Sequence, residues 1–393
     1  MSLCCRRRSR SLLGRTLLAA LCLGLILGLA MVSFGEQPDL DALIGQLGHD
    51  DFDQREQASR QLGDLGEPAL VALKAAGKHP DAEIRRRAAE IVTQIERRLY
   101  GEIAVLVGHT DGLWAAVFSP DGKRAATCSD DKSLRIWQVE SGRLLASFDL
   151  PSAINCARFF RDGNRLLVGL ANGHLAVYDV RDGKRLVEVG KHEDEVVGVE
   201  ILPGETDVIS VSRDRSLRRW NLATTSTVRT CANHSEMIRN VALAPSGTVA
   251  ATASFDGSVR VWNLDTGDEI QVIRPEGGMV FGVAFAPDGK RLATGSADRT
   301  ARVWDVESGE EIQRLEGHTG FVYSVQFLPD GKRLISAGED RSVRVWNLST
   351  GAQTRAFTGH NDYVRWVELS PDGKWFLSAS KDHTARLWNV PRE

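Results

Sequence analysis

Short apolar stretches separated by turn residues fill the chain from residue 101 onward. In the unit that ends at Trp304, four such stretches follow one another and read "MVFGVAFA", "RLATGSA", "TARVWDV" and "EIQRLEG". The "PDGK" between the first two predicts a hairpin, because Pro presets φ and Gly accepts a positive φ. Strands of almost continuous apolar character indicate sheets that are buried on both faces. Each unit therefore predicts four short strands.

An aromatic residue returns at a nearly constant interval along these units. Successive copies lie 41 or 42 residues apart, at Trp137, Tyr178, Trp220, Trp262, Trp304, Trp346 and Trp388. Trp304 is followed by Asp305, and Gly-His pairs stand upstream at Gly108-His109, Gly317-His318 and Gly359-His360. A period of about 40–45 residues with these dipeptides resembles the WD-repeat family. The resemblance implies a mainly β fold, with a seven-bladed WD-repeat β-propeller over residues 101–393.

The two ends of the repeat array complement each other. The last unit stops at Trp388-Asn389-Val390 without a fourth strand, whereas "EIAVLVG", residues 102–108, precedes the first unit as an extra strand. In the propellers that the chain resembles, the N-terminal strand completes the last blade and removes the open edge. We therefore expect residues 102–108 to close the ring.

Residues 36–100 change to helical spacing. Leu40, Leu43, Ile44 and Leu47 fit an i, i+3, i+4, i+7 pattern, and Pro68 and Pro80 are placed as first-turn prolines of helices. A 30-residue self-similarity pairs Asp51 with Asp81, Arg55 with Arg85 and Ala58 with Ala88. This resembles HEAT-type helical repeats. Two repeats are fewer than such arrays need to be stable alone. We therefore expect this small α-helical, HEAT-like module to depend on the propeller or a partner for its stability.

Residues 1–35 predict a signal peptide or a membrane anchor. Five arginines precede an unbroken apolar run from about Leu17 to Phe34. The run is longer than most signal-peptide cores and just long enough to span a bilayer, while Ser33 and Gly35 suit cleavage before Glu36. The body is thus expected to be exported, either membrane-anchored by a single N-terminal span or secreted or periplasmic after cleavage.

Charge and cysteine content limit the classes of partner, cofactor and metal that the sequence favours. The formal charge of −3, with five arginines and no acid in residues 1–35, leaves −8 on residues 36–393, which disfavours nucleic acid as a partner. Cys128, Cys156 and Cys231 are scattered and lack metal-site spacing. No hydrolase, phosphate-loop or calcium-loop motif occurs, so no cofactor and no metal are expected.

The resemblance implies a buried hydrogen-bond network in each blade, made of His, Ser or Thr, Asp and Trp. Carried over by position, its members are His109, Thr127, Asp131, Trp137; His192, Ser210, Asp214, Trp220; His234, Thr252, Asp256, Trp262; Thr294, Asp298, Trp304; His318, Ser336, Asp340, Trp346; and His360, Ser378, Asp382, Trp388. Ser, His and Asp together also suggest a hydrolase. Five complete copies around a ring favour a structural role, and no catalytic residue is assigned.

Two units depart from the pattern. The fifth has Glu276 in the His position, and the second has Leu150, Val168, Asn172 and Tyr178 in the four network positions. We expect the second unit, residues 143–190, to be the softest part of the ring.

Partner-contact positions are also implied by the resemblance. They lie three and five residues after the His position and just before the network Asp, on the face that commonly binds partners in the family. In this chain they include Trp114, Asp130, Asn155, Arg213, Met237, Arg239, Phe255, Met279, Phe281, Phe321, Tyr323, Glu339, Tyr363, Arg365 and Lys381. Aromatic residues, Met and Arg are enriched at interfaces, so an open apolar patch is expected, although several of these side chains could instead fill the channel.

The function expected from the sequence is that of a non-enzymatic, monomeric scaffold that binds a protein or peptide on this face. Phe281→Ala with Tyr323→Ala is expected to abolish binding and leave stability near wild type. The alternative is a hydrolase or lyase-type propeller enzyme at the channel mouth, where Asp130, Glu195, Glu339 and Arg365 are available.

Overall fold

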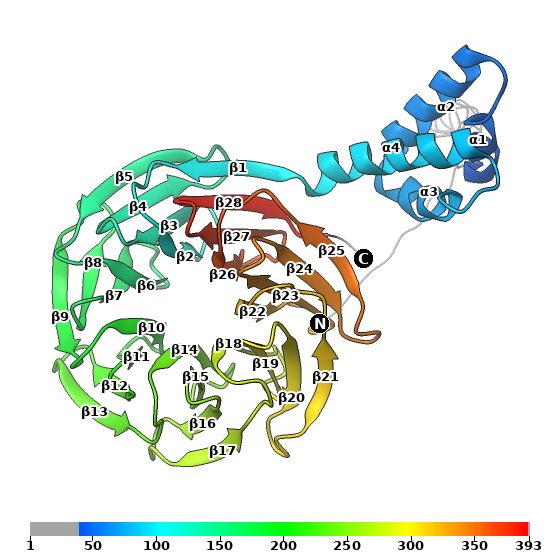
Figure 1. Cartoon of the computed structure of the whole chain (residues 1–393). Coiled ribbons are helices and arrows are strands. Elements are labelled where there is room, and N and C mark those ends of the chain that lie inside the picture. Colours follow the sequence, from blue (N-terminus) through cyan, green and yellow to red (C-terminus); the bar gives the residue numbers. More distant parts are fainter. Residues whose placement is uncertain (1–38, 392–393) are drawn as a thin grey trace, which may run out of the picture. The chain divides into compact units, whose positions relative to one another are not determined.

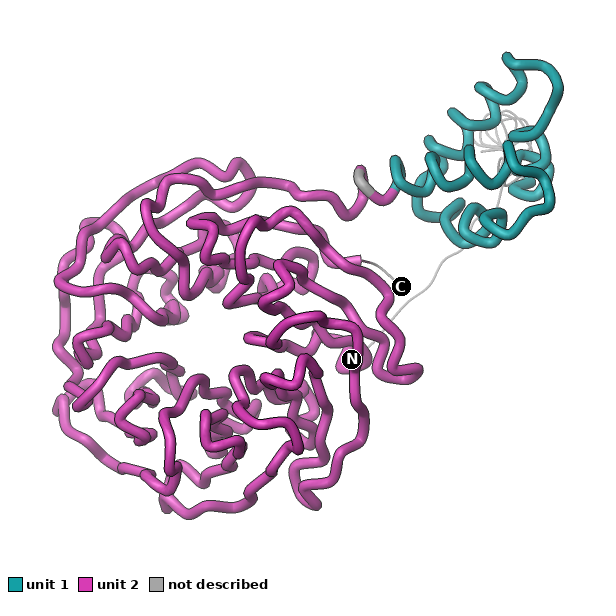
Figure 2. The backbone as a smooth tube through the Cα atoms, viewed as in Figure 1, with its two compact units in different colours: residues 1–95 teal, residues 96–393 magenta. Residues whose placement is uncertain are grey.

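The computed structural model describes residues 39–391, and the chain divides into two compact units, residues 1–95 and 96–393 (Figures 1 and 2). The expected signal or anchor in residues 1–35, and the cleavage position before Glu36, lie outside the described residues. Within residues 39–391, no helix combines the length and the apolar character needed to cross a membrane.

The first unit is helical. Its elements are α1 (Leu40–Gln46), α2 (Phe52–Leu65), the 3₁₀ turn η1 (Glu67–Ala69), α3 (Leu70–Ala76) and α4 (Ala82–Tyr100), whose last turn belongs to the second unit. Pro68 lies in η1 as a first-turn residue. Pro80 does not, because α4 begins two residues later at Ala82.

The 30-residue similarity is repeated in three dimensions. Asp51 caps α2 by accepting from the backbone N–H of Asp53 at 2.7 Å, and Asp81 caps α4 by accepting from that of Glu83 at 2.7 Å. In both copies an arginine then reaches back to the carbonyls before the helix: Arg55 to those of residues 49 and 50, and Arg85 to those of residues 79 and 80. Each copy therefore fixes its helix start by the same contacts.

The second unit contains seven four-stranded antiparallel sheets arranged as the blades of a ring (Figure 1). Blade 1 is β2 (Leu113–Phe118), β3 (Arg124–Ser129), β4 (Ser133–Gln138) and β5 (Arg143–Asp149); blade 2 is β6 (Ile154–Phe159), β7 (Arg165–Leu170), β8 (His174–Asp179) and β9 (Arg185–Lys191); blade 3 is β10 (Val196–Ile201), β11 (Asp207–Ser212), β12 (Leu217–Asn221) and β13 (Ser226–Cys231); blade 4 is β14 (Ile238–Leu243), β15 (Val249–Ser254), β16 (Val259–Asn263) and β17 (Glu269–Ile273); blade 5 is β18 (Val280–Phe285), β19 (Arg291–Ser296), β20 (Ala301–Asp305) and β21 (Glu311–Leu315); blade 6 is β22 (Val322–Phe327), β23 (Arg333–Gly338), β24 (Val343–Asn347) and β25 (Gln353–Phe357); blade 7 is β26 (Val364–Leu369), β27 (Trp375–Ser380), β28 (Thr384–Asn389) and β1 (Glu102–Val107).

The first strand closes the ring, as the sequence predicts. β1 pairs antiparallel with β28, from Glu102 opposite Trp388 to Val107 opposite Thr384. The pairing covers the edge that β28 would otherwise expose. Because β5 is the outer strand of blade 1, the unit 143–190 that the sequence predicts to be softest straddles two blades, and blade 2 itself runs from Ile154 to Lys191.

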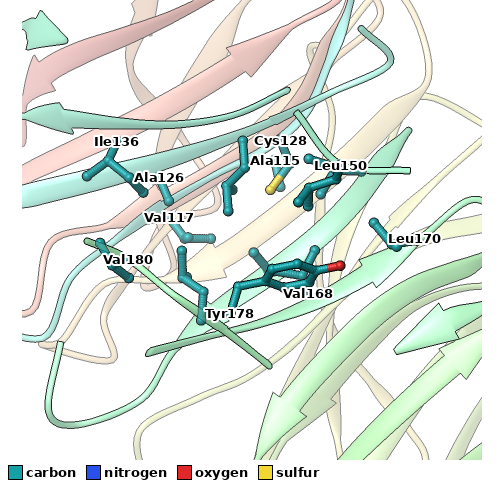
Figure 3. Close-up of a cluster of buried hydrophobic side chains, with 14 of the residues drawn as sticks. Ala115, Val117, Ala126, Cys128, Ile136, Leu150, Val168, Leu170, Tyr178 and Val180 are labelled. Carbon is teal, nitrogen blue, oxygen red and sulfur yellow. The ribbon is translucent and has the colours of Figure 1, made fainter. Parts of the chain in front are cut away.

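Apolar clusters between neighbouring blades form the core. One of them joins Cys128 and Ile136 of blade 1 to Val168 and Tyr178 of blade 2 (Figure 3). Others join blades 2 and 3, 3 and 4, 4 and 5, 5 and 6, and 7 and 1, so most of the sheets are buried on both faces.

Candidate partner-binding face

Five blades hold a complete four-residue network. In blade 1, His109 contacts Asp131 through Nδ1 at 2.8 Å and Thr127 through Nε2 at 2.7 Å, and Trp137 donates to the Thr127 hydroxyl at 2.8 Å. The same contacts, all between 2.7 and 3.0 Å, join the corresponding residues of blades 3, 4, 6 and 7, which are His192, Ser210, Asp214, Trp220; His234, Thr252, Asp256, Trp262; His318, Ser336, Asp340, Trp346; and His360, Ser378, Asp382, Trp388.

Burial and charge suit these networks to a structural role. Burial lowers the pKa of His109, so its neutral ring donates from Nδ1 to Asp131 and accepts at Nε2 from Thr127. Burial alone would raise the pKa of Asp131, but hydrogen bonds from Ser133 and the backbone N–H of Thr110 hold it well below its ordinary value. The Thr127 hydroxyl is fully buried, which gives a substrate no access to it.

A β-bulge occurs at the same place in every inner strand. The second residue of each inner strand falls out of the pairing register, and these residues are Trp114, Asn155, Val197, Arg239, Phe281, Tyr323 and Arg365. Bulges commonly re-aim a side chain at a functional edge. The position five residues after His in the repeat is therefore the bulge position.

A second repeated contact joins the other two kinds of expected partner-contact position, the residue three after the His position and the residue just before the network Asp. The backbone N–H of the residue before the network Asp donates to the carbonyl of the residue three after the His position. In blades 4 to 7 these bonds run from Phe255 to Met237, Ala297 to Met279, Glu339 to Phe321 and Lys381 to Tyr363, and in blades 1 and 3 they run from Asp130 to Gly112 and from Arg213 to Glu195. The expected partner-contact positions therefore gather on one face, called here the top face.

Aromatic side chains of blades 4 to 7 form one cluster on the top face. Phe281 lies at its centre, with ring centroids 5.4 Å from Phe255, 5.6 Å from Phe321 and 5.1 Å from Tyr323. Tyr363 extends the cluster, 6.2 Å from Tyr323. We call these five residues the aromatic cluster.

Burial within the aromatic cluster corrects one expectation. Phe281 is only 5% exposed, beneath its three neighbours, so it supports the face rather than contacting a partner. Phe281→Ala therefore removes buried contacts, and the expectation of near-wild-type stability for the variant with Phe281→Ala and Tyr323→Ala is wrong. Phe255, Phe321, Tyr323 and Tyr363 are partly exposed, and Met237 and Met279 lie beside them with similar exposure.

Two arginines of the top face contact the ring of Trp114. The guanidinium of Arg365 lies 4.0 Å from the Trp114 ring centroid and that of Arg239 lies 5.1 Å from it. Trp114 donates from Nε1 to Asp130 at 2.7 Å, and Arg365 pairs with the same carboxylate at 3.3 Å. Blade 1 thus contacts blades 4 and 7 across the channel mouth. Nearby, Glu195 pairs with Arg213 at 2.8 Å and accepts from Asn155 at 3.1 Å.

Comparison with known proteins decides the family. The profile of the WD domain, G-beta repeat, matches residues 101–138, 225–263, 267–305, 309–347 and 351–389. The chain is a WD-repeat protein.

Curated relatives share stretches of this WD-repeat array. Protein SUPPRESSOR OF PHYA-105 1 of Arabidopsis thaliana is 33% identical over 122 residues, 30% of this chain and 12% of the relative. Eukaryotic translation initiation factor 3 subunit I of Neurospora crassa is 30% identical over 95 residues, 23% of this chain and 27% of the relative. Echinoderm microtubule-associated protein-like 3 of Homo sapiens is 29% identical over 184 residues, 43% of this chain and 20% of the relative. The matches thus span between 12% and 27% of these relatives.

Two blades build the WD-repeat network differently. In blade 2, Leu150, Val168 and Tyr178 are all buried in the apolar cluster of Figure 3, and Asn172 is exposed. Replacing a whole set of buried hydrogen-bond partners by apolar groups leaves none of them unsatisfied. The residues 139–224 that the family profile leaves unmatched include blade 2 and most of blade 3, yet they form complete blades.

Blade 5 of the WD-repeat ring uses an arginine where the five complete blades use His. Trp304 still donates to Thr294 at 2.9 Å, but the Glu276 side chain does not take the His place. Instead Arg302, 1% exposed, bonds to Asp298 and donates to the carbonyl of Glu276 at 2.8 Å. Sequence reasoning missed Arg302, although an arginine recurs two residues before the network Trp in six of the seven units and is buried only here.

The sequence pattern also does not predict an ionic group inside the channel. Arg158 of β6 pairs with Glu200 of β10 at 2.9 Å and with Glu368 of β26. All three occupy the fifth position of an inner strand, which faces a channel cavity of about 150 Å³ that Trp366 also lines. Within residues 39–391, no group of three or more His, Cys, Asp and Glu side chains is placed to hold a metal ion.

Proposed function

We propose that the protein is a non-enzymatic interaction scaffold, exported or membrane-tethered, that binds a protein or peptide on its top face. The observation that carries the proposal is the aromatic cluster, which is built from four neighbouring blades and whose outer rings are partly exposed. Exposed aromatic residues beside arginines are typical of binding hot spots. Two relatives support the proposal by their names, one as a subunit of an initiation factor and one as a microtubule-associated protein.

The contacts of the acidic residues favour a scaffold over an enzyme. Asp130 is bonded to Trp114 and paired with Arg365, and Glu195 is paired with Arg213. Glu339 accepts from the backbone N–H of Phe321 at 3.1 Å. Each carboxylate that an enzyme would use at the mouth therefore already has a local partner. Reproducible turnover of esterase or lactonase substrates would overturn the proposal in favour of the enzymatic alternative.

The test of the binding face is crosslinking with mass spectrometry, carried out on native membrane fractions with full-length protein. The variant combines Phe321→Ala and Tyr363→Ala, which truncate two partly exposed rings. The matched control combines Ile270→Ala and Ile312→Ala on outer strands β17 and β21, where these side chains are 53% and 51% exposed. We expect partner crosslinks to persist in the control and to be lost in the variant. Crosslinks retained in the variant contradict the proposed face.

Export is tested on the same material. We expect protease to digest the propeller when the outer envelope is opened and the cytoplasmic membrane is intact, and N-terminal sequencing to show whether the chain begins at Glu36. A propeller that stays protected behind the intact cytoplasmic membrane contradicts export. Since one chain closes its own ring through β1 and β28, we also propose that the propeller is monomeric.

A further inference from the structure

We propose that the channel mouth binds one carboxylate of the partner, held by the Arg239 guanidinium and the Tyr323 hydroxyl beside the aromatic cluster. The inference rests on the proposed function and adds to it the chemistry of the partner: an acidic residue flanked by apolar ones.

Of the three arginines at the mouth, Arg213, Arg239 and Arg365, only Arg239 lacks a counter-ion among residues 39–391. Arg213 pairs with Glu195 at 2.8 Å and Arg365 pairs with Asp130 at 3.3 Å. Among the described residues, no carboxylate lies within 4.0 Å of the Arg239 guanidinium, whose contact is the face of Trp114. Its position on the β14 bulge aims it at the mouth. A partly buried charge without a counter-ion is costly, and a bound anion removes that cost.

The electrostatics of the site agree with this geometry. Burial, together with the neighbouring cations Arg365 and Arg213, lowers the pKa of Arg239 to about 10. The guanidinium still carries its charge at neutral pH. The surroundings therefore repel a positive charge at a position where the fold keeps one, and a carboxylate placed there would be attracted by all three arginines.

Tyr323 supplies a second donor. It is the bulge residue of β22, and its hydroxyl makes no hydrogen bond to the rest of chain segment 39–391. Burial, with Glu339 and Tyr363 nearby, raises the pKa of Tyr323 to about 12, so the phenol stays protonated. Arg239 and Arg365 act on this pKa in the opposite direction.

Charge balance favours a carboxylate over a phosphate. The charged side chains counted at the mouth are four cations, Arg213, Arg239, Arg365 and Lys381, and three carboxylates, Asp130, Glu195 and Glu339, so their sum is one positive charge. A singly charged carboxylate neutralises this site, whereas a phosphate, with nearly two negative charges at neutral pH, would leave the site with a net negative charge. The aromatic cluster beside Tyr323 then contacts the apolar neighbours of the acidic residue.

The probe is a library of N-acetylated, C-amidated peptides with one fixed central residue, which is Glu, Gln or phosphoserine, between degenerate positions. Binding to immobilised full-length protein is measured for wild type, Arg239→Met, Arg239→Lys, Tyr323→Phe and the control Arg143→Met, an exposed arginine on β5. We expect Glu to exceed Gln by about tenfold in wild type and control, which is what a charge-assisted hydrogen bond contributes. The preference is expected to vanish in Arg239→Met, to be partly kept in Arg239→Lys, and to weaken in Tyr323→Phe.

Folding of the variants is checked by thermal unfolding. Arg239→Met is expected to melt at or above the wild-type temperature, because it removes a charge without a counter-ion. Equal binding of Glu and Gln peptides to wild type overturns the inference, as does a Glu preference that survives in Arg239→Met, or a tenfold preference for phosphoserine over Glu. Peptides that bind without acid preference, with binding abolished by Phe321→Ala combined with Tyr363→Ala, would contradict the carboxylate site and support the top face as the binding face. Binding insensitive to all of these changes overturns the proposed function as well.

Discussion

One hydroxyl in each complete network serves two buried nitrogen atoms. In blade 4, the Thr252 oxygen contacts Nε2 of His234 at 2.7 Å and accepts from Trp262 at 2.9 Å. In blade 5 the same hydroxyl, Thr294, serves Trp304 alone. The pair of blades therefore isolates the contribution of the histidine.

Thr252→Val is predicted to destabilise the protein more than Thr294→Val does. The first change leaves two buried polar groups unsatisfied and the second leaves one, and each such group costs about 1–3 kcal/mol. The free energy of unfolding from urea titration should thus fall by at least about 1 kcal/mol more for Thr252→Val. Equal losses would mean that the histidine contributes nothing to the network.

Residues at fixed offsets from the repeated Trp could be predicted from the sequence, because the backbone geometry of each blade dictates them. The burial of Phe281 could not, since it depends on Phe255 and Tyr323 of two other blades. The same holds for Arg302, which donates to the carbonyl of Glu276 in the unit where Pro275-Glu276 stands in place of a Gly-His pair. Side chains whose surroundings come from neighbouring blades are the ones that a repeat pattern leaves undetermined.

At the scale of elements, the sequence predicts strand positions to within one or two residues. The stretch 279–286, for example, becomes β18, Val280–Phe285. The bulge in each inner strand was not foreseen, because an unpaired residue changes the register without changing the apolar pattern. The sequence predicts too early a start for α4, since Asp81 rather than Pro80 supplies the contacts that begin the helix.

Blade 2 is predicted to be locally soft at its loops rather than throughout. The backbone N–H groups of Asp131 and Asp214 donate to the hydroxyls of Ser129 and Ser212 at 3.1 and 3.0 Å. At the corresponding place in blade 2, the residue two before Asn172 is Leu170, which has no hydroxyl to accept the backbone N–H of Asn172. Hydrogen exchange should therefore be faster at Asn172 than at those two amides. Strands β7 and β8, buried in the apolar cluster, should stay protected. Matching protection at all three amides would contradict this prediction.

The closing strand offers a sharp test through two adjacent residues. Leu106 is 1% exposed and Val107 is 67% exposed, because they point to opposite faces of β1. Leu106→Asp buries a charge between blades 7 and 1 and is predicted to lower the free energy of unfolding by about 3 kcal/mol or more. Val107→Asp, the control, should change it by less than about 0.5 kcal/mol. Similar effects of the two changes, measured by urea titration, would show that β1 does not close the ring.

For the whole molecule, the networks predict a loss of stability as the pH falls. Burial lowers the pKa of His109, His234 and His318, so the unfolded chain binds protons below about 6.5 that the folded chain resists. The pKa of Asp256 is held at about 2 by bonds from Ser258 and His234 that outweigh burial, and the other network aspartates are lowered too.

Both groups act in the same direction, because in each case the unfolded state takes up more protons. The free energy of unfolding should therefore fall in two stages, first below about pH 6.5 and again as the pH approaches the ordinary aspartate value near 3.9. Urea titrations between pH 7 and 4 check this. A constant or rising stability over that interval would mean that the network histidines are charged in the folded state.

The pairing of β1 with β28 has a consequence for how the protein is made. β1 leaves the ribosome first among the strands, and its partner residues from Thr384 to Trp388 follow more than 270 residues later. At about 5–20 residues per second, this leaves the strand without its neighbour for roughly 15–60 s of synthesis. Throughout that interval Leu106 lacks the blade 7 half of its apolar cluster, and the nascent chain depends on the short length of β1 and the charge of Glu102 to avoid pairing with another molecule.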